Sequence, residues 1–195
     1  MKRFLVELIG TFFLTLAYAL TGNPLCYGLM FAAVIYLGAH ISGGYYNPAI
    51  TLALCLRGKH RKDHLAQLML GQLVGAMLAL FLSARATGQG FALPSDPSRV
   101  SAACLSEILL TFLLCALVLS LAAQKLKEVT GMVLGFTLIA LGYIGGMFNP
   151  AISLGSQLMS LLHGGGFDVN SLLVYFVCPL VGAALAAVLY KYYQD

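Results

Sequence analysis

The stretch GGYYNPAITL, from Gly43 to Leu52, returns near the end of the chain as GGMFNPAISLG, from Gly145 to Gly155. Both copies place Asn-Pro-Ala after a pair of glycines and before an apolar run. Asparagine is a strong helix N-cap, and proline favours the first helical position, where its missing N–H has no helical partner to lose. The two tripeptides therefore predict two helix starts, at Asn47, Pro48 and Ala49 and again at Asn149, Pro150 and Ala151.

Both predicted helices are too short to cross a membrane. The first apolar run ends at Leu56, before RGKH, and the second ends at Leu162, before HGGG. A helix needs about 20 residues to cross the hydrocarbon core of a bilayer. We therefore expect two re-entrant half-helices, which enter the membrane and return to the same side.

The composition indicates that lipid surrounds most of the chain. Of its 195 residues, 60% are hydrophobic and 9% are charged, whereas a soluble domain has about 25% charged residues. The chain contains several long apolar runs, and these lack the alternating polarity of β-barrel strands. We therefore predict an all-α membrane protein with six transmembrane helices, over the approximate ranges 4–20, 25–41, 65–84, 100–123, 132–144 and 172–190.

The chain contains an internal repeat. The segment VELIGTFFLTLAYAL, residues 6–20, aligns with LSEILLTFLLCALVLS, residues 105–120, and places Glu7 over Glu107. Each half holds three spans, an odd number, so the second half enters the membrane with the opposite orientation. We predict one channel domain over residues 1–195, with inverted repeats at about 1–85 and 100–195 joined by a loop at 86–99. Inverted repeats place the substrate path at their interface.

The first span also has the basic start and apolar stretch of a cleavable signal peptide. Glu7 interrupts that stretch, and the segment has the internal counterpart just described. We therefore expect it to be retained as a span.

Glu7 and Glu107 need an explanation, because a carboxylate at membrane depth is costly and usually functional. One interpretation is a proton relay, as in a coupled transporter. The other is a structural acceptor for backbone N–H groups in the irregular loop of the same half. The symmetric placement, without an intramembrane Lys or Arg partner, favours the structural interpretation.

The positive charges follow the predicted topology. Arg85 and Arg99 fall on one side of the membrane, and the other nine basic residues fall on the opposite side. By the positive-inside rule, both termini are then cytoplasmic. The nine are Lys2, Arg3, Arg57, Lys59, Arg61, Lys62, Lys125, Lys127 and Lys191.

Two half-helices entering from opposite faces would meet N-terminus to N-terminus at the midplane. Each N-terminus carries about +0.5 of an elementary charge, which repels cations in a poorly solvated place. The carboxamides of Asn47 and Asn149 can cap their helices through oxygen and offer N–H donors to the lumen. A water that accepts from both must point its hydrogens outward, which interrupts a proton wire. These features predict a pore for small neutral molecules.

The chain resembles the aquaporin and glycerol-facilitator family, the major intrinsic proteins, over essentially its full length. The resemblance lies in both Asn-Pro-Ala boxes, the paired Glu7 and Glu107 helices, HISGGYYNPA at residues 40–49 and YFVCPLVGAALAAVLY at residues 175–190. It implies an aquaporin-like fold and a homotetramer with one pore per protomer. We expect His40 to pack beside the inner mouth of the pore.

The resemblance also implies an outer constriction, a selectivity filter formed by Tyr27, Thr137, Gly146 and Ile152. The family usually has arginine at the position of Ile152. Isoleucine removes fixed hydrogen-bond donors and one positive charge, and Thr137 and Gly146 are small. We therefore expect a water channel with a relaxed filter that also passes glycerol, urea or ammonia. In the alternative, Ile152 only fills space and a neighbouring side chain or loop restores a narrow water pore.

No enzyme site is apparent, because no nucleophile is accompanied by a base. The five cysteines form no CxxC, so neither a metal site nor a cofactor is expected, and the charge pattern does not indicate nucleic acid. The expected partners are water, small neutral solutes and the bilayer. Two alternatives remain: a coupled secondary transporter and a non-conducting structural member of the same fold. The compact loops suggest a bacterial plasma membrane.

Overall fold

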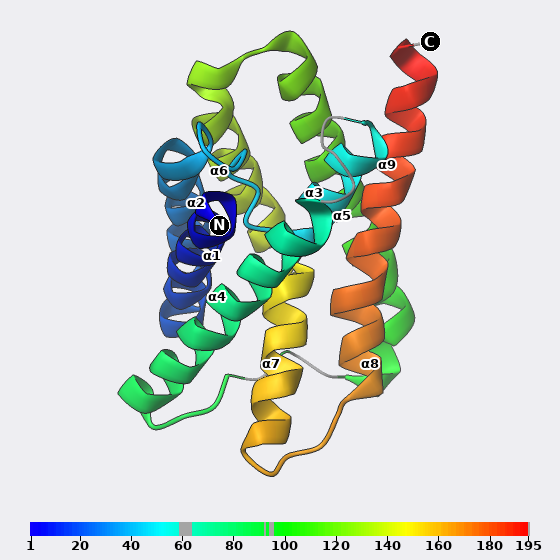
Figure 1. Cartoon of the computed structure of the whole chain (residues 1–195). Helices are drawn as coiled ribbons and strands as arrows, with labels where there is room; N and C mark the ends of the chain where they lie inside the picture. Colours follow the sequence, from blue (N-terminus) through cyan, green and yellow to red (C-terminus); the bar gives the residue numbers. More distant parts are fainter. Residues whose placement is uncertain (59–63, 92, 94–95, 195) are drawn as a thin grey trace.

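The computed structural model describes residues 1–58, 64–91, 93 and 96–194. Lys59, Arg61 and Lys62, which contributed to the charge pattern, and residue 94 of the loop lie outside this range. The regular elements of the described residues are all helical (Figure 1). They are α1 (Lys2–Thr21), α2 (Pro24–Gly38), α3 (Pro48–Leu56), α4 (Leu65–Thr87), α5 (Val100–Gln124), α6 (Lys127–Ile144), α7 (Pro150–Leu162), α8 (Val169–Leu172) and α9 (Cys178–Gln194), with a 3₁₀ turn at Pro97–Arg99 and a π-helical turn at Leu173–Val177.

The all-α membrane architecture is confirmed. Within the described residues, five helical stretches are long and apolar enough to cross a membrane: α1, α4, α5, α6 and the continuous segment Val169–Tyr193. The sixth apolar helix, α2, has 15 residues, which corresponds to about 22 Å. The helix α6 begins at Lys127 rather than near residue 132, because its first turn is polar and the hydropathy pattern does not detect it.

Glycines allow α4 to pack closely on α1 and α9 to pack closely on α5. A Cβ atom at Gly75 of α4 would lie 2.3 Å from the Leu8 carbonyl oxygen of α1, and one at Gly182 of α9 would lie 2.4 Å from the Ile108 carbonyl oxygen of α5. Leu8 and Ile108 each follow the repeated glutamate. The sequence suggests small-residue packing without saying whether it lies within or between chains, and the structure places these contacts within the chain.

The two halves meet along α2 and α6. A Cβ atom at Gly28 of α2 would lie 2.5 Å from the Gly135 carbonyl oxygen, and one at Gly135 of α6 would lie 2.7 Å from the Gly28 carbonyl oxygen. Because neither glycine has a side chain, the backbones of α2 and α6 approach each other closely at this point.

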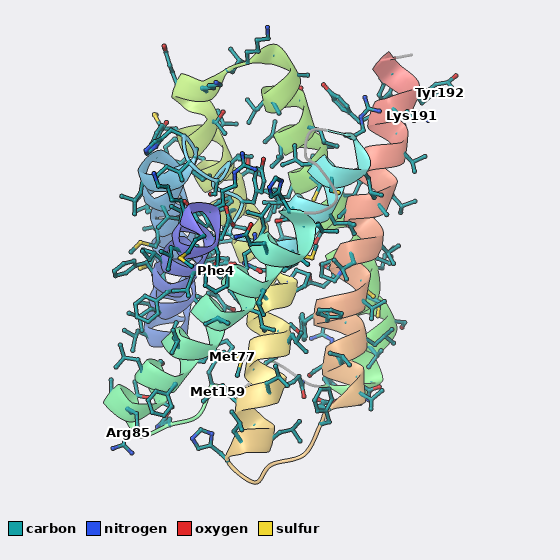
Figure 2. All side chains as sticks on the ribbon, viewed as in Figure 1. Phe4, Met77, Arg85, Met159, Lys191 and Tyr192 are labelled. Carbon is teal, nitrogen blue, oxygen red and sulfur yellow. The ribbon has the colours of Figure 1, made fainter. Side chains whose placement is uncertain are left out.

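The molecule has two opposite ends. The Tyr36 hydroxyl, near the end of α2, donates to the Glu128 carbonyl oxygen at the start of α6 (2.8 Å). We call this end the α5–α6 face, which is uppermost in Figure 1. Figure 2 places Lys191 at that face and Arg85 at the opposite end. The opposite end, called the linker face, holds the end of α4 and the end of α7 (Figure 1).

The glycine contacts lead to a test of the packing. Gly182→Ala should lower the apparent melting temperature in detergent, because its Cβ would overlap the Ile108 carbonyl oxygen and overpacking of this kind costs about 1–3 kcal/mol. Gly90→Ala is the matched control, because nothing lies within 4 Å of a Cβ placed there. Equal melting temperatures for the two variants would contradict close α5–α9 packing.

Candidate functional site

The half-helices α3 and α7 begin next to each other and run toward opposite faces (Figure 1). The Asn47 side-chain oxygen accepts a hydrogen bond from Ala49 N–H (2.8 Å), and the Asn149 side-chain oxygen accepts one from Ala151 N–H (3.1 Å). Each asparagine therefore caps its own helix, as its position before proline predicts. The starts of both helices, Asn-Pro-Ala in each case, are buried.

The amide groups of the same asparagines join the two halves. Asn47 Nδ2 donates to the Phe148 carbonyl oxygen (2.6 Å), and Asn149 Nδ2 donates to the Tyr46 carbonyl oxygen (2.9 Å). Each acceptor is the residue just before the opposite asparagine. One N–H of each side-chain amide therefore bonds across the junction rather than toward a lumen. The second N–H of each amide is not used in these two bonds.

Tyr46 and Phe148 both adopt a left-handed backbone conformation, with φ of 50° and 55°. This conformation costs about 1–2 kcal/mol for a residue that is not glycine. Burial offsets the cost, because both side chains are fully enclosed and the Tyr46 hydroxyl donates to the Val34 carbonyl oxygen (2.7 Å). Gly10 leaves space for the Tyr46 ring, since a Cβ atom there would lie 2.0 Å from Tyr46 Cε1.

The two repeated glutamates bind the backbone of these irregular segments. Glu7 accepts from Tyr45 N–H (3.1 Å), Tyr46 N–H (2.7 Å), the Ser42 hydroxyl (2.6 Å) and the Gln72 amide (2.7 Å).

Glu107 accepts from Met147 N–H and from Phe148 N–H (3.0 Å). Among the described residues, no Lys or Arg is a partner of either carboxylate. The geometry is that of a backbone acceptor in each half, with more donors around Glu7 than around Glu107.

The four residues of the expected outer constriction differ in environment. Tyr27 is 3% exposed and Ile152 is 0% exposed. The Thr137 hydroxyl donates to the Val133 carbonyl oxygen of its own helix (2.8 Å). The Tyr27 hydroxyl lies near the Asn149 side chain, so the structure brings this position next to the helix junction.

Gly146 has a packing reason to lack a side chain. Its φ is 146°, and a Cβ atom would lie 2.3 Å from the Phe148 ring and 2.9 Å from a Glu107 carboxylate oxygen. The absent side chain therefore makes room for the carboxylate and its backbone partners.

A cavity of about 580 Å³ opens at the α5–α6 face. Its apolar wall includes Phe31, Leu54 and Ile50, the residue directly after the first Asn-Pro-Ala. The exposed side chains of His40 and Lys127 also line it. The cavity therefore extends from the surface to the start of α3.

The loop between the halves contributes residues that the sequence analysis did not assign. The Phe91 ring contacts the Tyr18 ring at a centroid distance of 5.8 Å, and the Phe91 carbonyl oxygen accepts from the Ser156 hydroxyl of α7 (3.2 Å). Leu93 is 8% exposed and belongs to the core. The sequence signal that could have identified them is the presence of two apolar residues, Phe91 and Leu93, in a stretch rich in glycine and proline.

The family model described as "MIP: Major intrinsic protein" matches residues 16–190. The chain belongs to the major intrinsic protein family. It is 31% identical over 215 residues to "Glycerol uptake facilitator protein-like 6" of Lactiplantibacillus plantarum, with 96% of this chain and 95% of the relative covered. It is 30% identical over 237 residues to "Aquaporin AqpM" of Methanothermobacter thermautotrophicus, covering 98% of this chain and 96% of the relative.

A solved structure, the X-ray structure of the aquaglyceroporin from Plasmodium falciparum, superimposes with a TM-score of 0.82. The identity is 22%, and 97% of this chain and 95% of the other are covered, so this likeness supports the fold alone. As a major intrinsic protein, the chain is a multi-pass integral membrane protein and a passive channel for water or small solutes, not an enzyme. Within the described residues, no group of three potential metal ligands occurs.

The backbone-acceptor geometry of this major intrinsic protein leads to a test. Glu7→Gln should lower the apparent melting temperature and the amount of folded protein. The new amide would place N–H donors against Tyr46 N–H or the Gln72 amide, and an unsatisfied buried donor costs about 1–3 kcal/mol. Glu128→Gln, at an exposed glutamate, is the control. A stable Glu7→Gln variant with altered proton flux would instead support the proton relay.

Proposed function

We propose that this chain conducts water, and with it small neutral solutes such as glycerol, urea and ammonia, along a path past Asn47 and Asn149. The observation that carries the proposal is the meeting of α3 and α7 at these residues. The cavity that reaches Ile50 supports an inner entrance at the α5–α6 face. In this proposal, residues 1–85 and 100–195 act as inverted repeats of one channel domain.

Cation exclusion follows from the helix termini. The helices α3 and α7 have 9 and 13 residues, and both begin at the junction. Their N-terminal dipoles place about +0.5 of an elementary charge each beside the path. The structural role that we propose for Glu7 and Glu107 keeps these termini in place without a mobile charge.

We propose Tyr27, Thr137, Gly146 and Ile152 as the outer selectivity filter. Ile152 puts a side chain without hydrogen-bond donors directly after the second Asn-Pro-Ala, and this side chain is fully buried. The Tyr27 hydroxyl beside Asn149 supports a polar contact for passing solutes at this point. Without a guanidinium group, the filter has a relaxed chemical preference among neutral solutes.

Stopped-flow light scattering on proteoliposomes tests the proposal. The native protein should raise water permeability above that of empty liposomes, and electrical recordings should detect neither Na⁺ nor proton current. Saturable, ion-driven uptake would indicate a coupled transporter, and absent water flux would indicate a non-conducting member of the fold.

Substitution of Ile152 tests the relaxed filter. Ile152→Arg should reduce glycerol and urea permeability relative to water permeability, since it restores a charged group with fixed donors. Ile152→Val, which keeps the branched apolar shape, should leave the ratio unchanged. An unchanged ratio in a folded, water-conducting Ile152→Arg variant would show that Ile152 does not relax the filter.

We also propose that the protein is a homotetramer in a bacterial plasma membrane, with both termini cytoplasmic. The family resemblance supports the assembly, and Lys191 and Lys127 at the α5–α6 face support the orientation. Native mass spectrometry should give the mass of four chains, and a tag at either terminus should resist protease added to intact cells. A monomer, or a tag cleaved from outside, would contradict the corresponding part.

A further inference from the structure

Three aromatic rings from three separate segments form a continuous row on the linker-face side of Asn149. Tyr27, in the first turn of α2, packs on Tyr18 near the end of α1, with ring centroids 5.0 Å apart. Tyr18 in turn contacts Phe91 of the loop at 5.8 Å, with the rings nearly perpendicular. We call Tyr18, Tyr27 and Phe91 the aromatic row.

The aromatic row is attached at both ends to the α7 segment. At one end, the Tyr27 hydroxyl lies near the Asn149 side chain. At the other end, the Phe91 carbonyl oxygen accepts from the Ser156 hydroxyl, one turn beyond Ile152 on α7. Tyr18 and Phe91 are partly buried and pack against the hydrophobic core. The row therefore packs against α7, on the linker-face side of the second Asn-Pro-Ala.

We propose that Tyr18 and Phe91 complete the outer constriction together with Tyr27, and that this aromatic row sets the upper size limit for neutral solutes. The inference rests on the proposed channel function and deepens it. It assigns size selection to an aromatic wall that includes the loop between the halves, while the absence of arginine at Ile152 governs chemical preference.

The chemistry of the row supports discrimination by size. The ring faces and edges of Tyr18 and Phe91 replace none of the hydrogen bonds that a polyol gives up when it leaves water. The row has two polar groups, the hydroxyls of Tyr18 and Tyr27, and that of Tyr27 lies beside Asn149. A single water can bond to it without displacing the rings, whereas glycerol must also pass its carbon chain along the ring surfaces. We therefore expect water to pass readily and glycerol less so.

Removal of the loop ring is the direct test. Phe91→Ala should raise the ratio of glycerol to water permeability in proteoliposomes by up to about tenfold, because it removes one ring of the row; tenfold corresponds to about 1.4 kcal/mol in the barrier. Phe167→Ala is the matched control, because Phe167 is an exposed phenylalanine in another connection at the same face. The control should keep the native ratio.

Two further variants keep the test decisive if Phe91→Ala is not recovered in folded form. Tyr18→Leu removes the central ring, and Ser156→Ala removes the hydroxyl that holds the loop backbone. Both should raise the same ratio, with a smaller effect for Ser156→Ala. Native ratios in folded, water-conducting variants would overturn the role of the aromatic row. A native protein without water flux would overturn the proposed function itself.

Discussion

Two hydrogen bonds between side-chain amides and backbone carbonyls hold the centre of this structure. Asn47 donates to Phe148 and Asn149 donates to Tyr46, so each half of the chain completes the other. These bonds require the two carbonyls to face the opposite half, and the left-handed conformations of Tyr46 and Phe148 provide that direction. At membrane depth every backbone polar group needs a partner, and Glu7 and Glu107 accept the N–H groups that this conformation leaves outside a helix.

The same arrangement explains why several other residues are small. Gly10 and Gly38 receive the Tyr46 side chain, and Gly146 makes room for the Phe148 ring and Glu107. Gly75 and Gly182 then bring α4 and α9 close to the helices that carry the glutamates. A buried carboxylate therefore determines the backbone path, the path determines where the half-helices begin, and helix packing keeps the carboxylate in reach.

Sequence patterns predicted much of this fold. Asparagine followed by proline favours a helix start, and both copies of the repeat carry this pair before an apolar run. The starts of α3 and α7 and their meeting point could therefore be predicted. The cross-junction bonds were not, because they depend on the φ angles of Tyr46 and Phe148, which are not glycines. The aromatic row was also missed, since Tyr18, Tyr27 and Phe91 come together only after the loop folds back over α1 and α7. The roles of the constriction residues remain predictions.

The 15-residue length of α2 has a consequence for the surrounding membrane. Its span of about 22 Å is several ångströms shorter than the roughly 30 Å hydrocarbon thickness of a typical bilayer, whereas α5, with 25 residues, exceeds that thickness. Lipid chains along one flank must compress while those along another stay extended, at a fraction of a kcal/mol per Å of mismatch. Such uneven hydrophobic matching favours thin membranes, or a neighbouring protein that covers the short flank.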